Sequence, residues 1–306
     1  MTDTHFYRKQ VENFDPNKGI EDERKSYRLT CEYDDDQQVM LDLIDKFCSD
    51  PKATSVNALV IGMWGEPWDC SSEDTVKKLV ENKDKLQQLE ALYIGDMTFE
   101  DCEISWIIQS NVEAVFEAFP NLKLLKLRGG NELELGTVKH ESLEALIIHT
   151  GGVGKSVLHS MAGAELPSLK YLEIWLGTDE YGFDGSVEDV KPLMKADLFP
   201  NLTFLGLQNS CIADDIAIAF AEQTLQETLK HVDFSMGVMT DKGMEVLMSS
   251  GVLNSLETLN VESNYLSEKI LTEANNSLSL SLISGSQKED EDEDDEDPWR
   301  YVDVGE

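Results

Sequence analysis

The sequence predicts an α/β solenoid of about eight repeats, with parallel strands on its concave face and helices outside. Three observations predict this fold: a short apolar pattern recurs through most of the chain, amphipathic segments separate its copies, and both ends differ from the middle. A short strand cannot bury its apolar side alone, so stacked neighbours are expected to build one continuous core.

The repeated pattern is an apolar residue, two variable residues, an apolar residue, one variable residue and an apolar residue. Its copies start 33, 33, 21, 26, 33, 27 and 27 residues apart, close to the roughly 20–29-residue period of leucine-rich repeats. The chain is therefore expected to form a leucine-rich-repeat solenoid (horseshoe), with a truncated copy near Leu278 to Leu282. The full copies are Val56–Ile61, Leu89–Ile94, Leu122–Leu127, Leu143–Ile148, Leu169–Ile174, Leu202–Leu207, Leu229–Phe234 and Leu256–Val261.

The segments between the copies are expected to return the chain as helices. Val112–Phe119 places its apolar residues on one helical face, and Ser186 with Asp189 has the spacing of a capping box. Further helices are expected over Ile212–Leu225, Asp241–Ser250 and Ser267–Ala274.

The ninth position of the repeat often holds asparagine, and here Asn264 holds it in one copy. Glycine stands there in four others, at Gly130, Gly151, Gly177 and Gly237. Because glycine permits the positive φ angles of sharp turns, irregular loops are expected at the strand ends, in place of a uniform asparagine ladder.

The two ends of the chain are expected to differ from the repeat domain, which spans residues 51–285. Residues 1–50 are predicted to form an N-terminal cap, with a strand at Tyr27–Tyr33 and a helix at Gln38–Phe47 that cover the open edge of the first repeat. Residues 286–306 are predicted to be a disordered acidic tail with a short aromatic end. Nine consecutive acids, Glu289–Asp297, repel one another, so residues 285–297 are expected to be mobile.

The charge balance limits the classes of partner. The chain of 306 residues has a formal net charge of -35, and the residues before Ser286 still hold 49 acids against 23 bases. Such a field repels nucleic-acid backbones and anionic membrane surfaces, so neither is an expected partner. It favours a basic protein, a cationic ligand or a metal ion, although acidity also serves solubility alone.

The cysteines and the N-terminus indicate a cytoplasmic setting. Five widely spaced cysteines without a Cys-x-x-Cys pair fit reduced thiols, and neither a disulfide framework nor a zinc site. The first residues are polar and do not resemble a signal peptide. No stretch of the sequence approaches the roughly 20 apolar residues of a membrane helix.

Several stretches resemble a family of uncharacterised bacterial cytoplasmic leucine-rich-repeat proteins over roughly residues 50–306. The most specific are the Ile-Ser-Trp-Ile-Ile-Gln motif at Ile104–Gln109 and the Trp-Leu-Gly…Tyr-Gly motif at Trp175–Gly182. The terminal Arg300–Glu306 belongs to the same resemblance. It implies a repeat fold and a cytoplasmic location, and it brings no activity, cofactor or catalytic residue with it.

Motifs for enzyme chemistry are weak, and we expect no catalytic residue, no cofactor and no metal site. Gly151–Ser156 resembles a phosphate loop, but His149 stands where that motif requires its first glycine. His231 and Asp233 alternate on one strand and could form a small acid–base group or half a metal site, although a solvated strand gives the same pattern. The acidic clusters lack the spacing of a calcium loop.

The outward face of the sheet is the expected binding surface. Period-two alternation points apolar and aromatic residues outward in the first six copies, and an exposed apolar band on a soluble protein marks an interaction site. Two loops, residues 97–110 and 177–186, are expected to wall this band, or else to fold over and fill it. The predicted partner-binding residues are Tyr93, Trp106, Lys126, Arg128, His149, Tyr171, Trp175, Tyr181 and Phe204.

These observations favour a non-enzymatic interaction module whose concave face binds a protein or peptide, basic in character, or a small molecule. The alternative is a GTPase-activating or other enzyme-regulating protein, because some GTPase activators combine repeats of about 27–29 residues with an acidic C-terminal tail, which is an architectural likeness alone. A nucleotide-binding enzyme using Lys155 is the third hypothesis.

Overall fold

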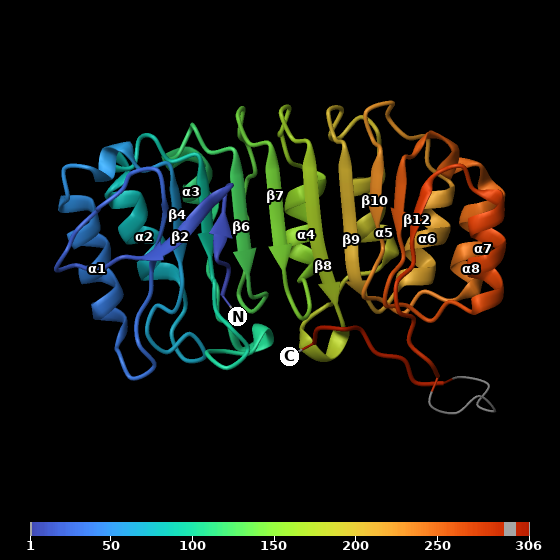
Figure 1. The fold of residues 1–306 in the computed structure, drawn as a ribbon, viewed down its shortest axis with the longest axis horizontal. Coiled ribbons are helices and arrows are strands. Elements are labelled where there is room, and N and C mark those ends of the chain that lie inside the picture. The colour runs from blue at the N-terminus through green and yellow to red at the C-terminus, as the bar shows by residue number, and fades with distance from the viewer. Residues whose placement is uncertain (1, 291–297, 306) are drawn as a thin grey trace. The chain divides into compact units, whose positions relative to one another are not determined.

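The computed structural model describes residues 2–290 and 298–305 (Figure 1). The chain forms two compact units, each described below by itself. The first comprises Met1–His149 and Gly163–Ser168, and the second comprises Thr150–Ala162 and Leu169–Gly305. Both consist of short strands with helices on one face, and every full copy of the repeat supplies a strand. The predicted α/β leucine-rich-repeat fold is confirmed.

The first unit has a sheet whose strands follow one another in chain order. The strands are β1 (His5–Phe6), β2 (Lys9–Asn13), β3 (Ser26–Leu29), β4 (Ala58–Ile61), β5 (Ala91–Ile94), β6 (Leu124–Arg128) and β7 (Ala145–His149). Strands β1 and β2 are antiparallel, and the pairs from β2 to β7 are parallel. Helices cover one face: α1 (Gln37–Ser49), α2 (Glu73–Glu81) and α3 (Glu113–Ala118), with 3-10 turns η1 (Ala53–Ser55), η2 (Lys83–Lys85) and η3 (Ile104–Trp106).

The second unit has a parallel sheet, again in chain order. Its strands are β8 (Tyr171–Gly177), β9 (Phe204–Ser210), β10 (His231–Asp233), β11 (Thr258–Asn260) and β12 (Ser281–Ile283). The last lies at the predicted truncated copy. Behind them lie α4 (Lys155–Ala162), α5 (Val187–Val190), α6 (Ala213–Ala221), α7 (Asp241–Ser250) and α8 (Glu268–Ser277), with turns η4 (Asp179–Tyr181), η5 (Lys191–Met194) and η6 (Val252–Ser255).

The core of each unit is built from the inward residues of the repeat pattern. In the first unit, Leu92 pairs in register with Leu59 on one side and Leu125 on the other, and all three are fully buried. In the second unit, Leu205 pairs in register with Leu172 and Val232. Each copy thus adds one rung to a ladder of buried aliphatic side chains, which is how a stack of strands too short to fold alone gains a core.

The N-terminal segment covers β4 and β5 on the outer face of the first unit, which the sequence did not indicate. Strands β1 and β2 cross this face on the side away from the helices (Figure 1). Phe6 packs there with Ala58, Val60 and Ala91, all buried. Strands β4 and β5 are therefore buried on both faces, whereas β6 keeps the predicted alternation of buried and half-buried residues.

Buried charges fix the N-terminal segment in place. Arg28 on β3 donates through Nε to Asp96 Oδ2 at 2.7 Å and also forms an ion pair with it through Nη2. The same guanidinium donates to the backbone oxygen of Asp3 at 2.6 Å, and the Asp3 carboxylate pairs with Lys126 at 3.0 Å. Buried charges persist when they are paired and hydrogen-bonded, so these contacts specify how the segment lies.

The glycines at the ninth repeat position serve two purposes. Gly177 has a φ of 76°, as expected for a turn that needs a left-handed residue. Gly151 and Gly237 have other φ values and are instead needed for close packing: a Cβ on Gly151 would lie 2.2 Å from Gly305 O, and one on Gly237 3.0 Å from Ser210 O. The expectation of positive φ is therefore corrected at these two positions.

The C-terminal segment differs from the predicted disordered tail. Residues 286–290 continue from β12, with Lys288 N–H donating to Asn264 O at 2.6 Å. Residues 298–305 lie against the second unit, along the edge where its strands end (Figure 1). The remaining part of the predicted mobile run, residues 291–297, lies outside the described residues. Among the described helices, none has the length and apolar content required to cross a bilayer.

Candidate functional site

The outer face of β8–β11 in the second unit carries its side chains in rows across the strands. Because the strands are parallel and in register, Tyr171 stands beside Phe204, and Phe204 beside His231. The next row along the strands holds Glu173, Gly206 and Asp233. These residues belong to the outward positions of the repeat, and all except Gly206 are half-buried.

The first row contains a stacked aromatic pair. The ring centroids of Tyr171 and Phe204 lie 4.1 Å apart and the planes are inclined by 4°. The Tyr171 hydroxyl donates to the Glu173 carboxylate, and burial raises its pKa, so the hydroxyl stays protonated and continues to donate at neutral pH. Stacked rings that hold each other in place form a preorganised apolar wall, and this wall stands directly beside a carboxylate.

The second row places two carboxylates on either side of a glycine. Glu173 and Asp233 both pair in register with Gly206, which leaves no side chain between them. A Cβ at Gly206 would lie 3.0 Å from Phe204 Cε1 and 3.4 Å from Glu173 Cγ. Gln208 Nε2 would also lie 3.0 Å from that Cβ. The space directly over Gly206 is therefore filled by the Phe204 ring, the Gln208 amide and the Glu173 side chain.

The Asp233 carboxylate is held in position and is electrostatically strained. Its Oδ1 accepts from Ser235 Oγ at 2.6 Å and its Oδ2 from Asn260 Nδ2 at 2.9 Å. Burial, together with the charge of Glu173, raises its pKa. A cation placed near both carboxylates would relieve this repulsion, which suits the acidic pair to a Lys or Arg side chain.

Trp175 borders the site on the strand-end side. Its indole Nε1–H donates to Gln208 Oε1 at 2.9 Å, across from β8 to β9. The predicted Tyr171, Trp175 and Phe204 thus lie together on neighbouring strands. His231 and Asp233, predicted as a small polar group, lie in successive rows, and His231 Nδ1 is 2.7 Å from Thr258 Oγ1.

The predicted residues of the first unit are arranged differently. Tyr93, expected in the open band, is 3% exposed because Phe6 packs on its ring at a centroid distance of 5.8 Å. Lys126 lies over the Tyr93 ring at 4.3 Å while pairing with Asp3. Arg128 pairs in register with His149, and its buried Nε finds no acceptor among the described residues. The N-terminal segment, and neither predicted loop, covers this part of the band.

The two predicted wall loops pack at strand ends. In the first, buried Gln109 donates to Arg128 O at 2.7 Å, and Trp106 stays 59% exposed. In the second, the Tyr181 ring lies against Gly305, where an added Cβ would be 2.6 Å from Tyr181 Cε2. Tyr181 is thus covered by the chain's own C-terminal segment.

The glycines of Gly151–Ser156 have a packing reason. A Cβ on Gly152 would lie 2.4 Å from Tyr181 O, and Val153 N–H donates to Leu176 O at 2.8 Å. Lys155 N–H donates to Asp184 Oδ1 at 2.6 Å. Phosphate loops need several backbone N–H groups aimed at one point, whereas these N–H groups bond to the protein itself.

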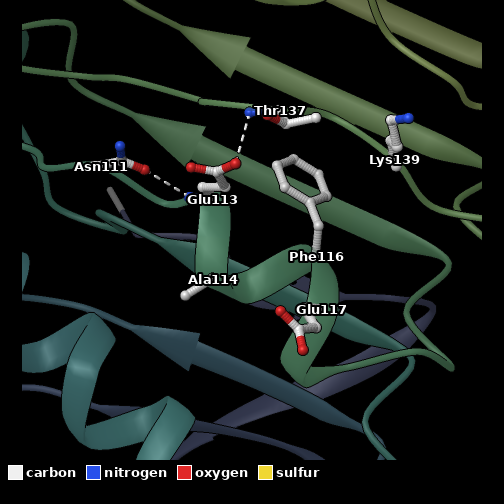
Figure 2. Close-up of a pocket in the computed structure, with 7 residues that line it drawn as sticks. All are labelled: Asn111, Glu113, Ala114, Phe116, Glu117, Thr137 and Lys139. Atoms are coloured by element: carbon white, nitrogen blue, oxygen red, sulfur yellow. Dashed lines mark hydrogen bonds between the residues drawn. The ribbon is translucent and has the colours of Figure 1, made fainter.

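A hollow of about 650 Å³ lies beside α3 in the first unit (Figure 2). Two charged side chains that line this hollow already have partners. Glu113 Oε1 accepts from Thr137 N–H at 3.0 Å, and Lys139 pairs with Glu165 at 2.7 Å. Within the described ranges, no group of three or more His, Cys, Asp or Glu residues is arranged to hold a metal ion. The outer face of the second unit therefore remains the better candidate site.

The sequence analysis did not predict that Glu173 and Asp233 lie in the same row of the sheet. Both occupy outward positions of the repeat, but they come from copies that are not adjacent in sequence, with the Gly206 copy between them. The signal was present in the alignment of copies, because Glu173, Gly206 and Asp233 hold the same position in three successive repeats. Asn209, which contacts the C-terminal segment, had no such signal.

The chain is similar to several solved structures. No family model matches it, and no curated protein matches it. A TLR13–ssRNA13 complex is 15% identical with a TM-score of 0.43, covering 86% of this chain and 33% of that one. An internalin of Listeria monocytogenes is 12% identical with a TM-score of 0.36, covering 87% and 75%.

The crystal structure of a protein from Bacteroides fragilis is much more similar. The two sequences are 33% identical, and the TM-score is 0.80. The match covers 89% of this chain and 77% of the Bacteroides fragilis chain. With this identity over most of both chains, the protein belongs to the same family as the Bacteroides fragilis protein.

Proposed function

We propose that the protein is a non-enzymatic interaction module that binds a basic protein or peptide on the outer face of β8–β10. The observation that carries this proposal is the acidic pair Glu173 and Asp233, which lie in one row on either side of Gly206. The stacked Tyr171 and Phe204 form an apolar wall beside this pair.

The arrangement matches the chemistry of a Lys or Arg side chain. Such a side chain presents an aliphatic or planar stem and a cationic head, so it packs on aromatic rings while its head reaches a carboxylate. Aromatic residues next to a charged group are the usual centre of a protein interface. The net charge of -35 adds long-range attraction for a basic partner.

The proposal is confined to the second unit. There the outer face keeps half-buried aromatic and acidic side chains, whereas in the first unit the N-terminal segment packs on β4 and β5. A partner approaching β8–β10 meets side chains of this chain that are already held in place by Gln208, Ser235 and Asn260. Such preorganisation lowers the entropic cost of association.

The test is affinity capture from a lysate with three purified proteins. They are the wild type, the double variant Phe204→Ala/Glu173→Gln, and the control Phe99→Ala/Glu100→Gln. Phe99 is an exposed aromatic of the first unit, 60% exposed, followed by an exposed acid, so the control removes the same groups elsewhere. Far-ultraviolet circular dichroism verifies that all three are folded, and mass spectrometry identifies the bound proteins.

The expected result is a basic protein retained by the wild type and by the control and lost from the Phe204→Ala/Glu173→Gln variant. Its retention should weaken as salt rises, because exposed charges are screened over about 8 Å at physiological ionic strength. Equal capture of every protein by the wild type and the site variant would overturn the proposal.

A further inference from the structure

The C-terminal segment runs along the edge of the second unit where β9 and β10 end (Figure 1). The groove that holds it is formed by its contacts with Asn209, Met236 and Tyr181. The segment binds there in extended form through its backbone. Asp303 N–H donates to Met236 O at 3.0 Å, and Tyr301 N–H meets the Tyr265 hydroxyl oxygen at 3.2 Å. Backbone bonds along an extended segment are the way in which protein surfaces commonly hold peptides.

Asn209 holds both backbone groups of one residue. Its Oδ1 accepts from Val304 N–H at 2.9 Å, and its Nδ2 donates to Val304 O. Asn209 is fully buried and has a φ of 54°, a left-handed conformation that asparagine tolerates better than most residues. A buried amide that satisfies both the N–H and the C=O of one peptide residue acts as a clamp for an extended backbone.

Side chains of the segment are held at two neighbouring positions. Val302 is buried. The Asp303 carboxylate accepts from Lys288 Nζ at 2.9 Å, and Lys288 lies 5.2 Å from the centroid of the Tyr265 ring. Burial lowers the pKa of Lys288, so its charged form depends on the acid opposite it. The groove therefore demands an acidic residue directly after an aliphatic one.

The end of the groove accepts only glycine. A Cβ on Gly305 would lie 2.6 Å from Tyr181 Cε2. The opposite wall is formed by Gly151, where a Cβ would lie 2.2 Å from Gly305 O. Contacts this close to a ring and to a backbone oxygen leave no room for a larger residue.

We propose that this groove is a site for an extended peptide segment with the order aliphatic–acidic–any residue–glycine, and that residues 302–305 are its occupant in cis. A partner with the same order enters by displacing them. The groove lies at the strand ends and uses Asn209, Met236 and Tyr181, so it is a second site, separate from the acidic pair beside Gly206.

The charge of the chain keeps the occupant exchangeable. Residues 302–305 follow the nine consecutive acids Glu289–Asp297. This run belongs to a strongly acidic protein, and like charges repel at short range. The repulsion favours release of the segment, and the groove contacts oppose it. A peptide in trans that carries the same four residues without the acidic run gains the same contacts and avoids this repulsion.

The test uses a fluorescently labelled peptide with the sequence of Arg300–Glu306 and a chain that ends at Asp297. Fluorescence anisotropy measures binding. The peptide is expected to bind the shortened chain, and to bind the full chain about tenfold or more weakly because the groove is already filled. Two changes should each weaken binding about tenfold or more: leucine in place of the peptide's glycine, and Asn209→Gly in the shortened chain, which removes the amide and still permits the left-handed backbone.

Absence of binding to a folded shortened chain, or equal binding of the leucine-containing peptide, would overturn the proposal. If the shortened chain does not fold, the full chain provides the test. An excess of free peptide should then speed hydrogen exchange at the Val304 amide, because the peptide displaces the segment. An unchanged exchange rate would refute displacement. Capture of a basic protein at the acidic pair beside Gly206 is measured with other variants, so the two proposals fail independently.

Discussion

Replacing Asn264 by alanine is expected to destabilise the second unit. Asn264 lies in the connection between β11 and α8, and its side chain is fully buried and bonds to four backbone groups. Its Oδ1 accepts from Met239 N–H at 2.9 Å, and its Nδ2 donates to Phe234 O at 2.9 Å. It also donates to Val261 O at 3.1 Å and to Glu262 O at 3.3 Å.

The magnitude follows from which of these groups lose their last partner. Val261 O still accepts from Gln287 Nε2 at 3.0 Å, and Glu262 O from Met236 N–H at 2.9 Å. Within the part of the chain that the structure describes, Met239 N–H and Phe234 O are left without one. Each orphaned buried group costs about 1–3 kcal/mol. The expected loss of unfolding free energy is therefore about 2–6 kcal/mol, towards the lower end if water enters the space.

Urea unfolding measures this loss, with Asn275→Ala as the matched control. Asn275 is an exposed residue of α8 that donates to Leu271 O at 2.9 Å, and its replacement should change the unfolding free energy by less than about 0.5 kcal/mol. A change for Asn264→Ala as small as that of the control would refute the reasoning that its amide is the sole partner of Met239 N–H and Phe234 O.

Two further predictions concern ionisation. Burial and the charge of Glu173 raise the pKa of Asp233. Because a cationic partner binds the ionised form of Asp233, affinity for a basic partner should fall as the pH is lowered. The fall should begin above the ordinary carboxyl pKa of 3.8. Binding titrations from about pH 7 to about pH 4 measure this fall. The variant Asp233→Asn should bind more weakly at neutral pH, and its affinity should depend less on pH. A wild-type affinity that does not change with pH would contradict the prediction. Burial raises the thiol pKa of Cys48 to about 12 and of Cys102 to about 11, so a thiol reagent at about pH 8 should react first at the more exposed Cys70. The first thiol to react should therefore be missing in the variant Cys70→Ser. If the variant reacts as fast as the wild type, Cys70 is not the first thiol to react.

The repeat fold was predictable because its signal is local. Each copy carries its own inward apolar residues, and period-two alternation then determines which neighbours face outward. Strands β6, β7 and β8 show this alternation as predicted, and the return helices begin near the predicted residues, with Ser186 and Asp189 forming the expected capping box. Asn264 was also identified from its position in the copy.

Contacts between distant segments could not be read in the same way. Phe6 buries Tyr93, and Asp3 pairs with Lys126, yet His5–Phe6 is too short to be recognised as a strand. Asn209, which holds Val304 from the end of β9, was not among the candidates, because its partner lies 95 residues away in the sequence.

The sequence by itself determined the repeat, the inward core and the outward positions of Tyr171, Trp175 and Phe204, because these follow from the periodicity of each copy. Only the tertiary structure decided which outward residues remain accessible. In the first unit the N-terminal segment covers β4 and β5 on the outer face, and in the second unit the C-terminal segment covers Tyr181. The physical reason is that covering a sheet face depends on contacts between residues far apart in the chain, and no local pattern encodes them.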